Sequence, residues 1–288
     1  MNPRRLGSRY LLHNQLGQGA MGVVWRGQDL DRGTEVAVKL LRSEYTANPA
    51  FVARFVGERN ALVRFRHQNV VALRDMIVEG DRLALVMELV TGGDLNAFRE
   101  RNGGTLSAAV TARLGAQIFD GLAAAHGAGI VHRDLKPTNV LLEGGQVKLA
   151  DFGIARIAGG AKVTSAGIVM GTVAYLAPEL IKGEEPAAAG DVYAVGITLY
   201  ELLSGAVPFE GHVAAVMNAH VHTVPERIAG VPDRLWDLIA ACLSKDAAAR
   251  PTAAHMSGAL AALAAANLPG GTGLPGGTGL PGGTGLPG

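Results

Sequence analysis

The sequence predicts an α+β protein with two lobes, in which a small strand-rich lobe precedes a larger helix-rich one. In the first 90 residues, short runs of valine, leucine and isoleucine alternate with glycine and charged residues, as in strands joined by turns. After residue 94, apolar residues recur mostly at helical spacing. The chain has 288 residues, 48% of them hydrophobic, which is enough for a large core.

Four runs in the first part of the chain predict strands. They cover residues 23–30, 34–41, 70–78 and 82–89. Between the second and third runs, apolar residues from Phe51 to Phe65 follow a roughly helical period, which predicts a helix packed on the sheet.

The second part of the chain predicts helices with two short strands between them. One helix is expected between Ser107, a suitable N-cap, and Gly127, a suitable end. Residues 191–205 and 234–246 have the same character. The segment 139–151 predicts a hairpin that interrupts these helices.

Charge and cysteine content exclude several classes of protein. The net charge is +1, which gives no reason to expect a nucleic acid or an anionic membrane as partner. The single cysteine, Cys242, lies in an apolar run and is expected to be a buried structural thiol in a reducing cytoplasm. We find no secretory signal, and the apolar run 253–266 is shorter than the ~20 residues of a spanning helix.

The two ends of the chain are expected to lie outside the folded domain. Residues 1–9 are an N-terminal extension, and residues 265–288 contain three copies of LPGGTG and a fragment of a fourth. Glycine and proline bury little surface, so this tail predicts a disordered linker to something beyond it. A cell-wall sorting signal of the LPxTG type is the alternative, but the repeat has one residue too many and no apolar span follows it.

A glycine-rich run is the first candidate for a binding site. Residues 17–24 read GQGAMGVV, and the glycines Gly17, Gly19 and Gly22 allow a backbone to approach phosphates closely. The same spacing occurs in dinucleotide-binding folds and in plain hairpin turns. The dinucleotide-binding version needs a following helix and an acidic residue, whereas a strand-like run and Lys39 follow here.

A lysine at the end of an apolar strand is the second candidate. Lys39 closes the run Val36-Ala37-Val38 and is either a solvated edge residue or a phosphate ligand. Glu58, on the predicted helix 51–65, is its natural partner, although Glu58 is equally compatible with an exposed helix face.

The third candidate lies between Ile130 and Arg156, where charged residues stand among apolar ones. It reads HRDLKPTN, then eleven residues, then DFG. Together with the first two motifs, this set resembles the Hanks-type protein serine/threonine kinases, and the composition resembles their bacterial, actinobacterial branch. The resemblance covers about residues 10–264, and it implies a bilobal kinase fold with lobes at 10–89 and 90–264.

The resemblance implies a role for each charged residue. Asp134 is the catalytic base and Lys136 lies near the γ-phosphate. Asn139 and Asp151 hold Mg²⁺, for which Mn²⁺ can substitute, and Lys39 binds the α- and β-phosphates of ATP while paired with Glu58.

The resemblance also assigns the adenine pocket. Met87 is the gatekeeper, and the backbones of Glu88 and Val90 form the hinge. Apolar contacts to the nucleotide come from Leu16, Val24, Ala37 and Leu141.

The remaining matches concern regulation and structure. Thr164 and Ser165 are the expected phosphorylation sites of an activation loop, Arg133 is their phosphate partner, and Thr172 lines the substrate pocket. Five residues are expected to have structural roles. His132 and Phe152 belong to a stack of side chains that links the lobes, and Asp191 braces the catalytic loop. Glu179 and Arg250 form a buried ion pair.

The sequence therefore predicts a cytoplasmic kinase that phosphorylates serine or threonine in proteins and itself, with a homodimer as a reasonable state for autophosphorylation. A pseudokinase that binds ATP or serves as a scaffold is the alternative. The presence of Lys39, Asp134 and Asp151 argues against it. A small-molecule phosphotransferase is a third reading, against which the Ala177-Pro178-Glu179 segment argues.

Overall fold

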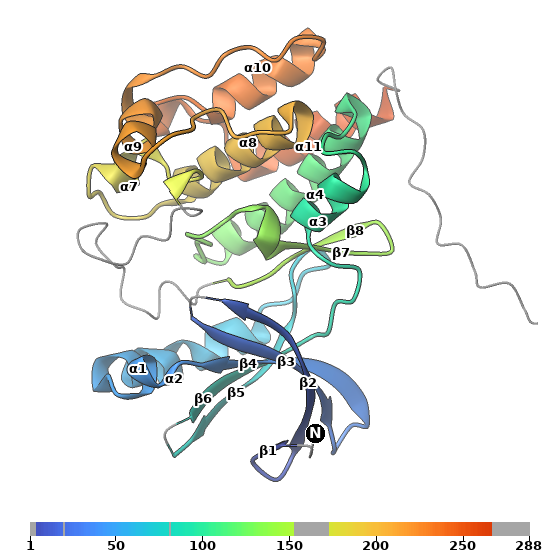
Figure 1. Ribbon diagram of the computed structural model, residues 1–288, viewed down its shortest axis with the longest axis vertical. Helices are drawn as coiled ribbons and strands as arrows, with labels where there is room; N and C mark the ends of the chain where they lie inside the picture. The colour runs from blue at the N-terminus through green and yellow to red at the C-terminus, as the bar shows by residue number, and fades with distance from the viewer. Residues whose placement is uncertain (1–3, 20, 81, 153–172, 267–288) are drawn as a thin grey trace, which may run out of the picture.

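The structure, a computed structural model, confirms the predicted fold class. It describes residues 4–19, 21–80, 82–152 and 173–266, without the side chains of Arg54 and residues 58–62. In Figure 1, a curled sheet and the two helices beside it form the lower lobe, and a larger helical lobe lies above them. The short hairpin β7–β8 of the helical lobe faces the sheet.

Six antiparallel strands form the sheet of the first lobe, in the order β1-β2-β3-β4-β6-β5. The sheet begins before residue 10, because Leu6 is buried in one cluster with Tyr10 and Leu12. The elements of this lobe are β1 (Arg4–Leu6), β2 (Tyr10–Gly19), β3 (Gly22–Asp29), β4 (Thr34–Leu41), α1 (Ser43–Thr46), α2 (Pro49–Arg64), β5 (Leu73–Glu79) and β6 (Arg82–Met87).

Strand alternation gives this sheet two apolar faces. Leu83 and Leu85 of β6 pack in one cluster with Phe55 of α2, whereas Ala84 and Val86 belong to a cluster on the opposite face. Successive side chains of a strand point to opposite faces, so one apolar strand serves both clusters. Helix α2 is thereby fixed against the sheet.

The second lobe has one main core, around helices α4, α8, α10 and α11. Its elements are α3 (Leu95–Arg101), α4 (Ala108–Gly127), η1 (Pro137–Asn139), β7 (Val140–Glu143), β8 (Gln146–Leu149), α7 (Pro178–Ile181), α8 (Ala188–Ser204), α9 (Val213–His222), α10 (Asp233–Cys242), η2 (Ala247–Ala249) and α11 (Ala253–Ala265). The predicted cap of α4 is confirmed, since Ser107 Oγ accepts a hydrogen bond from the Val110 N–H at 3.4 Å. Helix α10 ends before the predicted residue 246.

Helix α8 is the centre of this core, and residues 190–199 are all buried. Cys242 of α10 packs against it, is fully buried, and has a thiol pKa raised by that burial. The expected buried thiol is therefore confirmed. The run 253–266 forms helix α11 and its C-cap, and α11 lies against α4. Within the described part of the chain, no helix is both long and apolar enough to span a membrane.

A close approach between α8 and α10 generates the first prediction. A Cβ on Gly196 would lie 2.8 Å from Cys242 Cβ and 2.9 Å from Leu243 Cδ2. Gly196→Ala should therefore lower the free energy of unfolding by about 1–3 kcal/mol, as overpacking does. Gly258→Ala, at an exposed position of α11 where a Cβ meets nothing within 4 Å, should instead be neutral or stabilising. Urea denaturation measures both, and equal stability of the two variants would contradict the packing argument.

A buried histidine lies between α8 and α9. His220 is fully buried, and its Nδ1 lies 2.9 Å from the Tyr193 hydroxyl, with the Phe209 ring packed edge-on beside it. Lys245 lies over the Phe209 ring. Burial first, and then the charge of Lys245, lower the pKa of His220 to about 4.

This lowered pKa makes stability depend on pH. The unfolded chain protonates this histidine near its usual pKa, about 6.5, whereas the folded chain does not until about pH 4. The free energy of unfolding should thus fall by about 2–3 kcal/mol from this group as the pH falls through that window. His220→Gln should show a shallower loss in urea denaturation between pH 7 and pH 4.5. Parallel pH curves for parent and variant would refute the assignment.

Candidate active site

A buried carboxylate on α8 holds the loop that precedes the hairpin β7–β8. Asp191 Oδ2 accepts a hydrogen bond from the His132 N–H, and Oδ1 accepts one from the Arg133 N–H, both at 2.8 Å. His126 Nε2 lies 2.8 Å from Oδ2. Arg133 has a φ of 72°, a strained backbone conformation for a residue with a side chain. The three contacts hold the loop in this shape.

His132 extends the same arrangement toward β8. Its ring is fully buried, its Nε2 lies 2.8 Å from the Ala150 carbonyl oxygen, and it packs on Phe152 with ring centroids 4.5 Å apart. The loop is thereby joined to the residues on either side of Asp151.

Three polar side chains converge on the loop after Arg133. Lys136 Nζ lies 3.1 Å and 2.9 Å from the two carboxylate oxygens of Asp134. Asn139 Nδ2 donates to the Asp134 carbonyl oxygen at 2.7 Å and to Oδ2 at 3.2 Å. Because the amide nitrogen of Asn139 faces Asp134, its side-chain oxygen remains an acceptor.

Lys39 and Asp151 come together from the two lobes. Lys39 of β4 is buried, and its Nζ lies 2.8 Å from Asp151 Oδ2. Asp151 follows β8 and has a φ of 63°, so its backbone is also in the left-handed region. The predicted partner of Lys39, Glu58, has its side chain outside the described residues.

The glycine-rich run forms the end of β2 and the start of β3, where Gly17 pairs with Val24 and Gly19 with Gly22. A Cβ on Gly22 would lie 2.0 Å from the Leu40 carbonyl oxygen, so only glycine fits there. A Cβ on Gly17 or Gly19 would meet nothing within 4 Å, so the space beside them is open to a ligand. Leu16, just before them, is exposed.

The residues expected around adenine lie on neighbouring strands. Ala37 of β4 pairs directly with Met87 of β6, and Val24 of β3 pairs with Lys39. Leu141 lies on β7 of the second lobe. Glu88 follows β6, and its N–H donates to the Ala72 carbonyl oxygen at 2.9 Å.

The backbone of the hinge has hydrogen-bonding groups that are available to a ligand. Among the residues that the structure describes, neither backbone group of Val90 has a hydrogen-bond partner. An unpaired edge of this kind suits the hydrogen-bonding edge of a base.

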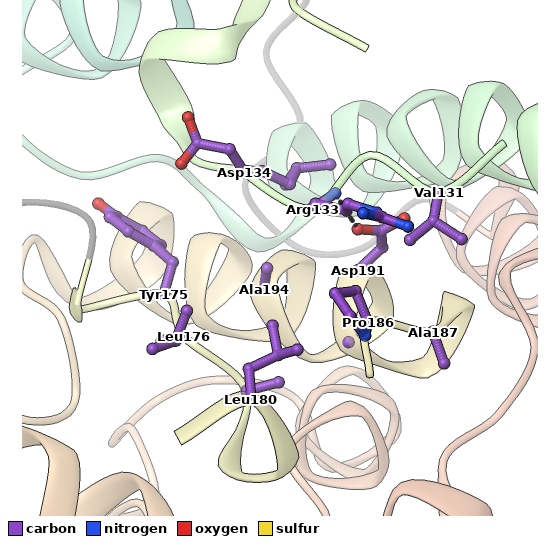
Figure 2. A pocket seen from close by; sticks show the side chains of 13 residues that line it. Val131, Arg133, Asp134, Tyr175, Leu176, Leu180, Pro186, Ala187, Asp191 and Ala194 are labelled. Carbon is purple, nitrogen blue, oxygen red and sulfur yellow. Dashed lines mark hydrogen bonds between the residues drawn. The ribbon is translucent and has the colours of Figure 1, made fainter. Parts of the chain in front are cut away.

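A small cavity of about 20 Å³ lies behind the loop that carries Arg133 and Asp134, and Figure 2 shows it. Arg133, Asp191, Tyr175, Leu180 and Pro186 are among its lining residues. Its volume suits a single water molecule. The Asp134 carboxylate is turned away from Asp191 in Figure 2, and Arg133 Nε is buried with no hydrogen-bond partner in the described part of the chain.

A bidentate ion pair lies further along the second lobe. Arg250 Nη1 and Nη2 each lie 2.7 Å from one carboxylate oxygen of Glu179, and both side chains are buried. Arg250 Nε also donates to the Ser244 carbonyl oxygen at 2.8 Å. This pair ties α7 to the segment before α11.

Comparison with known proteins decides the family. Residues 10–259 match the family described as the protein kinase domain. The chain belongs to the protein kinase family. It is 45% identical over 267 residues to the serine/threonine-protein kinase PkaB of Streptomyces coelicolor, covering 89% of this chain and 63% of PkaB.

Other bacterial kinases match over the same part. The chain is 44% identical over 277 residues to the serine/threonine-protein kinase PkaA of Streptomyces coelicolor, covering 91% of this chain and 51% of PkaA. It is 39% identical over 260 residues to the serine/threonine-protein kinase PknL of Mycobacterium tuberculosis, covering 88% of this chain and 65% of PknL. The chain thus spans about half to two thirds of these curated relatives. The resemblance to bacterial Hanks-type kinases is confirmed.

Several expected residues of the kinase lie outside the described residues. They are Thr164, Ser165 and Thr172, in the segment 153–172, and the side chain of Glu58. The other expected residues of the nucleotide and phosphoryl-transfer sites lie on the loop 132–139, around Asp151, on strands β2, β3, β4, β6 and β7, and in the hinge after β6, as described above. The expected structural residues Glu179, Asp191 and Arg250 lie in the helical lobe.

The sequence did not predict several polar contacts near this loop. Tyr175 donates its hydroxyl to Glu201 Oε2 at 2.6 Å, and Arg99 Nη2 lies 3.4 Å from Glu201 Oε1. Burial first, and then this hydrogen bond, raise the pKa of Tyr175 well above its usual range. The contact of His126 with Asp191 was not predicted either. The only indication in the sequence was the position of His126 in the last turn of the predicted helix 107–127.

The Asp191 contacts generate a prediction for this kinase. Asp191→Ala removes the acceptor of two backbone N–H groups, so the loop bearing Asp134 should lose its geometry. The kcat should fall by about 100-fold, the cost of a small misplacement of reacting groups, while the Kd for ATP stays within about twofold. Asp191→Asn keeps one acceptor oxygen, so its kcat should lie between that of the parent and that of Asp191→Ala. Steady-state kinetics, nucleotide titration and circular dichroism measure these effects, and an unchanged kcat in folded Asp191→Ala would contradict them.

Proposed function

We propose that this chain is the catalytic domain of a protein serine/threonine kinase that uses Mg²⁺ and ATP. The observation that carries the proposal is the convergence of Lys136 and Asn139 on Asp134, on a loop held from behind by Asp191. Phosphoryl transfer needs little covalent chemistry and much positioning and charge neutralisation. This arrangement supplies both.

In the proposed reaction, a serine or threonine hydroxyl of a protein substrate donates its proton to the Asp134 carboxylate as its oxygen attacks the γ-phosphorus of ATP. The bond between that phosphorus and the β,γ-bridging oxygen breaks, and ADP leaves with the electron pair. Lys136, which already contacts both oxygens of Asp134, lies where its charge stabilises the transferring group. The proton then passes from Asp134 to solvent.

The metal would be held by Asn139 and Asp151. The side-chain oxygen of Asn139 has no hydrogen-bond partner among the described residues, and Asp151 contacts Lys39 through Oδ2. No cluster of three or more histidine, cysteine, aspartate or glutamate ligands occurs among the described residues. Two oxygen ligands suit Mg²⁺, which keeps waters and binds substrate phosphates, and Mn²⁺ would fit the same donors. The metal neutralises phosphate charge when bound.

Nucleotide binding is proposed to use both lobes. The open backbone at Gly17 and Gly19 would cover the phosphates, and Lys39 would contact the α- and β-phosphates. Adenine would contact Val24, Ala37 and Leu141, with Leu16 above and Met87 behind, and would hydrogen-bond to the backbone of the hinge at Glu88 and Val90.

Regulation is proposed to act through the segment 153–172. Thr164 and Ser165 are the candidate phosphorylation sites, and Thr172 is the candidate substrate-pocket residue. The buried Arg133 Nε without a partner supports a role for Arg133 in binding a phosphate from that segment. We also propose that the domain, which includes β1 before residue 10, ends with α11 near residue 264 and is followed by a linker, that it acts in the cytoplasm, and that two copies phosphorylate each other. The pseudokinase alternative gains no support, because Lys39, Asp134 and Asp151 are all present.

The test is a time course of intact mass. The purified chain is dephosphorylated, mixed with Mg²⁺ and ATP, and compared with Asp134→Asn. The parent should gain steps of one phosphate, with fragmentation placing the first in 153–172, and Asp134→Asn should slow by about 100-fold or more. Chelating the metal should stop the parent.

Two results would overturn this proposal. Equal phosphorylation of parent and Asp134→Asn would remove Asp134 as the base, and no phosphorylation with ATP binding intact would favour the scaffold alternative. A per-molecule rate that is independent of dilution would exclude phosphorylation between two copies.

A further inference from the structure

The carboxylate of Glu88, at the hinge, is held by donors from two other segments. Oε1 lies 2.8 Å from Lys148 Nζ, and Oε2 accepts a hydrogen bond from the Ala72 N–H at 3.2 Å. The N–H of Glu88 itself donates to the Ala72 carbonyl oxygen at 2.9 Å. Glu88 is thus attached through both its backbone and its side chain, and Lys148 supplies the only charge among these contacts.

Lys148 links this hinge to the strand that ends just before Asp151. It lies on β8, directly opposite Leu141 of β7. The next residue of β8, Leu149, donates its N–H to the Asn69 carbonyl oxygen at 2.8 Å and accepts from the Val71 N–H at 2.9 Å. The segment 69–72, the hinge and β8 therefore form one hydrogen-bonded junction, and Lys148 spans it with its side chain.

The pair differs from an ordinary surface ion pair in its burial. The side chains of Lys148 and Glu88, 2.8 Å apart, are 15% and 24% exposed, whereas those of Arg26 and Glu35, 2.7 Å apart, are 42% and 54% exposed. Exposed pairs contribute little because water and salt screen them. A partly buried, charge-assisted hydrogen bond is stronger, and removing its cation leaves a carboxylate short of partners.

We propose that Lys148 is a positioning residue for the nucleotide, which acts by fixing Glu88 and with it the backbone of the hinge. The inference rests on the proposed function, because it takes the hinge as the site that hydrogen-bonds to adenine. Lys148 contacts none of the residues proposed to transfer the phosphoryl group. Its effect therefore falls on ATP affinity and leaves the chemical step unchanged.

The test compares Lys148→Met, which keeps the length of the side chain without its charge, with Lys148→Arg and the parent. Lys148→Met should raise both the Kd and the KM for ATP about tenfold, the factor for losing one charge-assisted hydrogen bond, while kcat stays within about twofold. Lys148→Arg should restore most of the affinity. Arg26→Met is the matched control, because it breaks an exposed ion pair between β3 and β4 of the six-stranded sheet, and its Kd should equal that of the parent.

A double-mutant cycle with Glu88→Gln tests the mechanism. If Lys148 acts through Glu88, the double variant should lose less affinity than the two single losses combined. An unchanged Kd in Lys148→Met, or a fall in kcat without a change in Kd, would overturn the inference. Failure of the proposed function gives a different result. The parent would then bind ATP, and Lys148→Met would still raise the Kd for ATP, but the parent would transfer no phosphate. A parent that binds no ATP would overturn both.

Discussion

The loop 132–139, which carries the proposed base Asp134, depends on one buried carboxylate. Asp191 is 2% exposed, and a buried charge is costly unless it is hydrogen-bonded. Two backbone N–H groups and His126 satisfy it, and these same contacts hold Arg133 at a positive φ. Helix α8, which is buried along residues 190–199, therefore sets the geometry of the loop 132–139. The position of Asp134 follows from the geometry of that loop.

A second set of contacts joins the two lobes around β8. Lys39 reaches Asp151 from β4, while the segment 69–72 is hydrogen-bonded to both Leu149 and Glu88. Asp151 is consequently positioned by groups from both lobes. Any motion of the first lobe that breaks the Lys39 contact would change the site, which is a physical basis for control of this kinase through its lobe arrangement.

Backbone constraints divide the glycine-rich run into two parts. Gly22 is required by packing, because Leu40 leaves no room for a Cβ, whereas Gly17 and Gly19 face open space. Packing alone explains the first glycine and not the other two. The open space at those two positions is consistent with the close approach of a phosphate to the backbone.

The sequence by itself determined the order of the lobes and the helix boundaries at Ser107 and Gly127, and it identified the charged residues that are candidates for the site. Those features depend on local periodicity, capping and motif spacing, which are contained in short stretches of chain. It did not reveal strand β1 or the contacts of His126, Lys148, Tyr175 and Glu201. Each of these side-chain contacts depends on a partner distant in the chain, as when Lys148 meets Glu88 or Tyr175 meets Glu201, whereas β1 pairs with the neighbouring strand β2. Only the tertiary structure decides such pairs, because any charged or polar residue has many possible partners until packing brings one of them within hydrogen-bond distance.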